Sequence, residues 1–182
     1  MKALLKTAPR PGALEVRDVP RPTPGPGEAL VQVAGATLCG SDLHIADWDP
    51  IFHGFMKPPM VLGHEFAGVV LEAGAGVTGV RPGMSVVAES VIYCGSCSYC
   101  REGRTQICAQ RQLFGVHRPG GMAEMVSVPA HLLHPLPPGM PVSPDVGLLG
   151  VVSVALPAIT VHNPVPTVGV FPANVPVVEH ID

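Results

Sequence analysis

A dense group of reactive side chains lies in the segment ATLCGSDLH, residues 36–44. It places a thiol, a hydroxyl, a carboxylate and an imidazole close together in the chain: Cys39, Ser41, Asp42 and His44. Further along, His64 and Glu65 are adjacent. A thiolate, an imidazole and a carboxylate are the kinds of ligand that hold a catalytic zinc ion while leaving one position open to water or substrate. A buried cysteine and a hydrogen-bonded core histidine would explain the same residues without a metal.

A second group consists of four cysteines in the pattern C-x2-C-x2-C-x7-C: Cys94, Cys97, Cys100 and Cys108. Short spacers let neighbouring turns direct four sulfur atoms at one point, so the pattern predicts a closed, structural zinc site. An iron–sulfur cluster and two disulfides are the alternatives. Arg101 and Arg104 lie inside the loop and would either donate hydrogen bonds to the thiolates or remain solvated.

Short runs of alternating apolar residues, separated by glycine and proline turns, predict that these groups are positioned by strands. The expected strands lie at 13–20, 29–35, 60–74, 84–90 and 120–130. One helix is expected over 143–156, with Ser143 as N-cap. The fold class predicted from this spacing is mainly β, either a barrel or a sandwich.

Composition excludes several classes of protein. The net charge of −3 provides no basic stripe for nucleic acid, so we expect no DNA or RNA partner. The opening residues resemble no signal peptide, and the longest apolar run, 146–156, is far shorter than the roughly 20 residues that span a bilayer. We therefore expect no membrane contact and a cytoplasmic location, where cysteines bind metal or react more often than they form disulfides.

Five segments together carry a resemblance to a known family. In chain order they are TLCGSDLHI, GHEFAGVV, EAGAGVTGVRPGMSV, CGSCSYCREGRTQIC and GGMAEMVSVPA. They resemble the catalytic domain of the zinc-dependent medium-chain alcohol, polyol and threonine dehydrogenases. The resemblance implies a GroES-like β-barrel over residues 1–160, with a zinc-binding loop at 94–108 and a few short helices. Residues 161–182 would form a proline-rich tail, with a strand that returns to the barrel as one option.

The resemblance also implies roles for individual residues. A structural zinc would bind the four cysteines of 94–108, and a catalytic zinc would bind Cys39 and His64, with Glu65 as ligand or close neighbour. Asp42 would orient His64, while Ser41 and His44 would relay the proton of a zinc-bound alcohol. Without the metal, Ser41 would be a hydroxyl that caps a short helix and His44 an exposed residue on it.

Two departures from the family pattern affect the predicted function. Gly150-Val151 stands where the family usually has Glu-Pro, which removes a carboxylate from the neighbourhood of the catalytic zinc. Only 26 residues, 157–182, follow the predicted helix, whereas a single βαβ unit already needs about 30. A nucleotide-binding domain is therefore not expected in this chain. His162, Glu179 and His180 would lie either near the metal or in solvent.

One glycine pattern imitates a nucleotide site. Gly74-x-Gly76-x-x-Gly79 matches G-x-G-x-x-G, but Pro82-Gly83 follows at once and no helix pattern begins there. Because the motif works only when the last glycine opens a helix, we expect a β-turn instead.

Three functions remain open at this point. The first is a dehydrogenase catalytic domain that does not bind NAD(P) alone. The second is a zinc enzyme with non-redox chemistry, such as a lyase, dehydratase or hydrolase. The third is a zinc-stabilised binding module. The first two predict a small-molecule substrate. An apolar face left by a missing domain would favour a homo-oligomer or another protein partner.

Overall fold

Strands dominate the structure, a computed structural model that describes residues 1–137, 139, 140 and 142. In chain order its strands and helices are β1 (Lys2–Lys6), β2 (Leu14–Asp18), β3 (Glu28–Ala36), α1 (Gly40–Ala46), β4 (Met60–Val61), β5 (Phe66–Ala73), β6 (Ser85–Ala88), β7 (Val91–Ile92), α2 (Ser98–Arg101), β8 (Gln112–Leu113), β9 (Met125–Pro129) and β10 (Leu133–Pro135). Short 3-10 turns lie at η1 (Pro50–Phe52), η2 (Thr105–Ile107) and η3 (Ala130–Leu132). Two predicted regions lie outside the described residues. One is the helix expected over 143–156, which includes Ser143 and Gly150-Val151. The other is the tail, with His162, Glu179 and His180.

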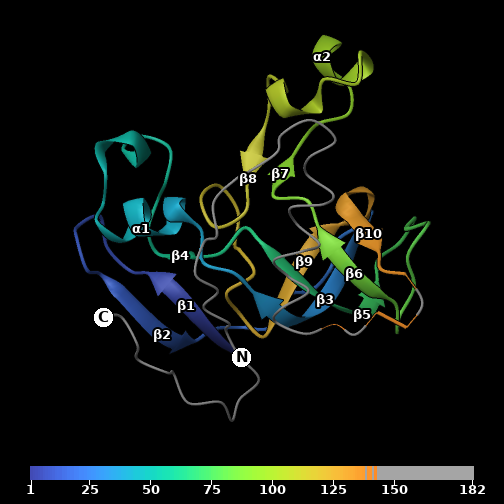
Figure 1. The fold of residues 1–182 in the computed structure, drawn as a ribbon, viewed down its shortest axis with the longest axis horizontal. Helices are drawn as coiled ribbons and strands as arrows, with labels where there is room; N and C mark the ends of the chain where they lie inside the picture. Colours follow the sequence, from blue (N-terminus) through green and yellow to red (C-terminus); the bar gives the residue numbers. More distant parts are fainter. Residues whose placement is uncertain (138, 141, 143–182) are drawn as a thin grey trace.

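Antiparallel pairing builds two main sheets (Figure 1). The larger has the order β10-β6-β5-β3-β9 and the smaller β2-β1-β4, while β7 and β8 form a separate pair. The two main sheets are joined where Leu4 N donates to Met122 O at 2.8 Å. Inward-facing side chains of the larger sheet, such as Val31, Phe66 and Val70, form the core, and Leu4 of β1 packs against it from the smaller sheet.

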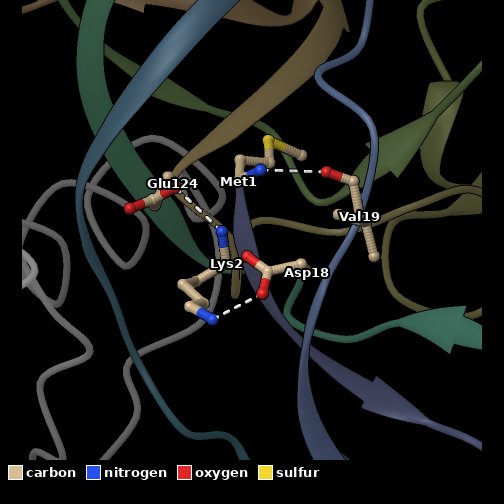
Figure 2. Close-up of polar contacts among 5 residues, drawn as sticks. All are labelled: Met1, Lys2, Asp18, Val19 and Glu124. Atoms are coloured by element: carbon tan, nitrogen blue, oxygen red, sulfur yellow. Dashed lines mark hydrogen bonds and ion pairs between the residues drawn. The ribbon is translucent and has the colours of Figure 1, made fainter.

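The first residues of the chain are held at this junction (Figure 2). The amino group of Met1 donates to Val19 O at 2.9 Å, and the backbone N–H of Lys2 donates to the Glu124 carboxylate at 2.8 Å. The Lys2 ammonium also pairs with Asp18 at 2.6 Å. The sequence patterns predicted β2, β3, β5, β6 and β9, but not β1, which pairs with the next strand, β2, and with β4.

The glycine pattern at 74–79 lies in the turn between β5 and β6, as predicted. Gly76 and Gly79 have φ of 77° and 84°, a left-handed conformation that glycine adopts without strain. The segment leads into strand β6 rather than a helix. This turn therefore has no helix N-terminus for a dinucleotide pyrophosphate. Among the described residues, no helix has the length and apolarity needed to cross a membrane.

Candidate metal centres

The ladder between β3 and β5 brings Cys39 next to the adjacent residues His64 and Glu65, and these three residues are hereafter the barrel cluster. The last rung of this ladder pairs Ala36 with Phe66, and Thr37 N extends it by donating to Glu65 O at 3.0 Å. Cys39 then begins α1 as its N-cap residue. One ligand atom from each member of the barrel cluster lies within 4.8 Å of the others.

Close backbone packing supports the segment that carries His64. Gly63 has a φ of 91°, and its carbonyl accepts from Gly121 N at 2.9 Å. A Cβ at Gly121 would lie 2.2 Å from the Phe66 ring, and one at Gly120 would lie 2.0 Å from Gly63 O. Only glycines allow this approach, so the Gly-Gly pair is part of the scaffold of the barrel cluster.

His64 is almost fully buried beside a second buried residue, Asp42. His64 Nδ1 lies 3.7 Å from Asp42 Oδ1, and neither atom has a hydrogen-bond partner. The other ring nitrogen, Nε2, lies 3.2 Å from the Ser41 hydroxyl. The imidazole therefore lies between Asp42 at Nδ1 and Ser41 at Nε2.

Electrostatics within the barrel cluster favour a thiolate. Burial acts to lower the pKa of His64, but the hydrogen bond with Cys39 and the charge of Asp42 raise it above its usual value. The same hydrogen bond with His64 lowers the pKa of the Cys39 thiol against the opposing effect of burial. A thiolate is the form that binds metal.

α1 presents the residues that follow Cys39. The Asp42 carboxylate accepts from Cys39 N at 2.9 Å, which caps the helix and fixes Asp42 next to His64. His44 lies on the exposed surface of α1, with its Nδ1 3.2 Å from Asp49 Oδ2. The structure thus gathers Ser41 and Asp42 around His64 and leaves His44 at the solvent boundary.

Sequence reasoning did not identify Thr37. Its hydroxyl donates to Glu65 Oε2 at 2.6 Å, and its side chain is buried. The available signal was a polar residue at the end of an apolar strand, two positions before Cys39.

The four-cysteine cluster (Cys94, Cys97, Cys100 and Cys108) lies in a loop that extends from the sheets around α2 (Figure 1). Its Sγ–Sγ separations include 3.5 Å for Cys94–Cys108 and 3.9 Å for both Cys94–Cys100 and Cys97–Cys108. A disulfide needs about 2.05 Å. Zinc–sulfur bonds of about 2.3 Å in a tetrahedron require sulfurs about 3.8 Å apart, so these distances fit a zinc ion.

Backbone N–H groups donate to these sulfurs. Cys97 N donates to Cys94 Sγ at 3.4 Å, and Gln110 N donates to Cys108 Sγ at 3.3 Å. The backbone donors of Ser96 and Cys97 lower the pKa of Cys94 to about 6. Loss of solvent and the neighbouring sulfurs raise the pKa of Cys100 to about 12.

The two arginines of the loop have other contacts. Arg104 lies 3.8 Å from the Glu102 carboxylate, with its guanidinium 5.6 Å from the centre of the Tyr99 ring. Arg101 lies in the last turn of α2 and is exposed. The donors found at the sulfurs are backbone N–H groups and the Ser96 hydroxyl, and both arginines correspond to the second option from the sequence, solvated charges.

Comparison with known proteins places this geometry in a family. The family model described as the alcohol dehydrogenase GroES-like domain matches residues 25–138. The chain belongs to this GroES-like family. The match covers both clusters and every strand from β3 to β10, which confirms the fold expected from the sequence.

Curated relatives of this GroES-like domain are zinc-type medium-chain dehydrogenases. L-threonine 3-dehydrogenase from Pyrococcus abyssi is 43% identical over 141 residues, covering 78% of this chain and 40% of that protein. The enzyme of the same name from Saccharopolyspora erythraea is 44% identical over 129 residues, covering 71% and 37%. The chain thus spans about two fifths of the length of these relatives.

Solved structures show the same fold. Galactitol-1-phosphate dehydrogenase from Escherichia coli superposes with a TM-score of 0.73 at 31% identity, over 82% of this chain and 41% of that one. A cobalt- and zinc-bound thermostable alcohol dehydrogenase from Pyrobaculum aerophilum gives 0.68 at 36% identity, over 74% and 40%.

Proposed function

We propose that this chain is the zinc-binding catalytic domain of a medium-chain dehydrogenase that acts on a small alcohol or polyol. A catalytic zinc would bind the barrel cluster, and a structural zinc would bind the four-cysteine cluster. The observation that carries the proposal is the convergence of Cys39, His64 and Glu65 within 4.8 Å at one end of the β3–β5 ladder. The zinc-dependent relatives support it.

The two unpartnered atoms next to the barrel cluster fit a metal-binding histidine. A proton on His64 Nδ1 would point toward Asp42 Oδ1, 3.7 Å away, and an approach of less than 1 Å would bring the two atoms within hydrogen-bond distance. The lone pair on Nε2 would then face Cys39 and the metal. Histidine ligands commonly donate their second ring N–H to a carboxylate in this way, which fixes the tautomer.

The residues of α1 supply a route for the proton. Zinc at the barrel cluster would polarise an alcohol or carbonyl oxygen. The Ser41 hydroxyl, 3.2 Å from His64 Nε2, is next to the position where that oxygen would lie. Ser41 and His44 are three residues apart on one face of α1, so His44 would pass the proton from Ser41 to solvent.

The remaining parts of the reaction need residues beyond those described. Hydride transfer requires a nicotinamide held by protein. We do not expect the GroES-like domain alone to bind NAD(P). A cavity of about 360 Å³ lies between the N-terminal segment, the loop at 118–120 and β9, and its lining includes no residue of the barrel cluster. The substrate pocket is therefore expected to need a second surface that covers the barrel cluster.

Zinc content tests the proposal directly. Elemental analysis of the purified chain should give about two zinc ions, and Cys39→Ser and Cys100→Ser should each give about one. The two variants are matched, because each replaces one thiol at a different cluster. A Cys39→Ser protein with undiminished zinc would refute a metal at the barrel cluster, whatever the result for Cys100→Ser.

A further inference from the structure

Thr37 makes two contacts with Glu65. Its backbone N–H donates to Glu65 O at 3.0 Å, and its hydroxyl donates to Glu65 Oε2 at 2.6 Å. The pair directly follows the rung between Ala36 and Phe66, so the two residues are opposite each other across the ladder. Side chains of directly opposite residues lie on the same face of a sheet, which explains why the hydroxyl meets the carboxylate.

The hydroxyl distinguishes the two oxygens of Glu65. Oε2 is held by Thr37, whose side chain is 2% exposed and has no water to replace this partner. Turning Glu65 so that both oxygens approached Cys39 and His64 would leave a buried hydroxyl without an acceptor, which is unfavourable. Thr37 therefore holds one orientation of the carboxylate.

A second carboxylate nearby, which is buried, makes this orientation important. Asp42 Oδ1 lies 3.7 Å from His64 Nδ1. A hydrogen bond from a neutral hydroxyl withdraws negative charge from Oε2 without adding a competing cation. The imidazole of His64 can then have two carboxylates nearby, those of Asp42 and Glu65.

We propose that Thr37 is a positioning residue that turns a single oxygen of Glu65 toward the metal. The position that the second oxygen would fill stays open for the oxygen of a substrate. This inference rests on the proposed zinc at the barrel cluster and adds a residue that determines how the cluster binds it. Groups that hold metal ligands in place commonly contribute 10- to 100-fold to metal affinity.

Two substitutions test the role of the hydroxyl. Thr37→Val keeps the branched shape and removes the donor, while Thr37→Ser keeps the donor. Thr7→Val is the matched control, because the Thr7 hydroxyl also contacts a glutamate, Glu15, at 3.3 Å, but at an exposed position. Each variant of the full chain is loaded with cobalt, and the visible absorption is recorded as the difference from the Cys39→Ser chain, so that cobalt at the four-cysteine cluster cancels. Zinc affinity is measured by competition with a chromophoric chelator.

In the wild-type chain and in Thr37→Ser and Thr7→Val, we expect the strong visible absorption of four-coordinate cobalt. In Thr37→Val the absorption should weaken as a second carboxylate oxygen enters, and zinc affinity should fall about tenfold or more. A Thr37→Val spectrum that superposes on wild type, with affinity within about threefold, would overturn the role of Thr37 alone. If cobalt uptake is the same in Cys39→Ser as in wild type, the proposed function fails and this inference fails with it.

Discussion

The four-cysteine cluster offers four protein ligands and the barrel cluster three, and the two are assembled in different ways. The four cysteines lie within residues 94–108, and local turns bring them together. The barrel cluster joins Cys39 to His64 and Glu65 through the β3–β5 ladder and the start of α1. Local spacing is therefore sufficient for the first cluster, whereas the second exists only when the barrel is folded.

This difference predicts that the two clusters respond to different substitutions. The four-cysteine loop has little apolar burial of its own, since only Cys108 of its four ligands is buried. A metal is then the main source of its order. The barrel cluster depends on packing, and a metal adds to a site that the fold has already formed.

Removal of a thiol from the loop should have the largest effect. In Cys97→Ser the loop should lose nearly all of its zinc, because one missing ligand opens a closed tetrahedral site. Amide hydrogen exchange should then accelerate through residues 94–108 and stay unchanged in β3 and β5. Acceleration that spread equally into β3 and β5 would show that the two regions are not independent.

Gly121→Ala should have the largest effect on the barrel. The new Cβ would lie 2.2 Å from the Phe66 ring, so the substitution should lower the free energy of unfolding by about 3 kcal/mol. It should also weaken metal binding at the barrel cluster, because Gly121 N holds Gly63 next to His64.

Gly40→Ala is the control for this substitution. Gly40 begins α1, and a Cβ there meets nothing within 4 Å. Its free energy of unfolding, measured by urea denaturation, should stay within about 0.5 kcal/mol of wild type. Equal destabilisation by both substitutions would contradict the close packing at Gly121.

Lys6→Met tests how α1 is fixed to β1. The buried Lys6 ammonium donates to Ala46 O at 2.7 Å and to Arg10 O at 2.8 Å. Loss of these bonds leaves Arg10 O without its donor and leaves Ala46 O with only the N–H of Gly12, at 3.0 Å, so it should cost about 1–3 kcal/mol. Lys2→Met, which removes only an exposed pair with Asp18, should change unfolding by less than about 0.5 kcal/mol in the same denaturation assay.

Glu28→Gln should have the smallest effect, and the effect should depend on pH. Burial opposes ionisation of Glu28, but hydrogen bonds from Arg118, Ser127 and the Gly25 backbone hold the pKa of this carboxyl below its usual range. A lowered folded pKa stabilises the fold above the unfolded value, near 4.3, and this contribution disappears as pH falls through the folded value.

The wild-type chain should therefore be more stable than Glu28→Gln by about 1 kcal/mol at neutral pH. The difference should shrink as pH falls below about 5. Urea denaturation of both proteins across that range measures it. A difference that stayed constant with pH would show that Glu28 contributes through packing rather than charge.

The sequence predicted the parts of the molecule that local patterns determine better than the parts that depend on contacts between strands. Alternating apolar residues were sufficient for β3, β5 and β9, and cysteine spacing was sufficient for the loop. β1 was missed because its five residues, KALLK, do not alternate between polar and apolar, although the strand pairs with the neighbouring β2. Thr37 was missed because its role depends on which residue faces it across a ladder, and a single strand pattern does not contain that register.

The resemblance to a family, rather than spacing, first assigned roles to Ser41, Asp42 and His44. The geometry supports these roles unequally. Asp42 is buried beside His64, whereas His44 is exposed and pairs with Asp49. Helical spacing places His44 on the same face of α1 as Ser41, but it does not predict that His44 contacts Asp49.

The pairing of β7 with β8 has a consequence for how this domain changes over evolutionary time. Val91–Ile92 and Gln112–Leu113 lie next to each other, so the chain leaves the body of the domain and returns to it at a single place. Everything between these two short strands can be lengthened, shortened or exchanged without moving the ends. The segment between β7 and β8 can therefore change or be lost in a related protein while the barrel cluster keeps its geometry.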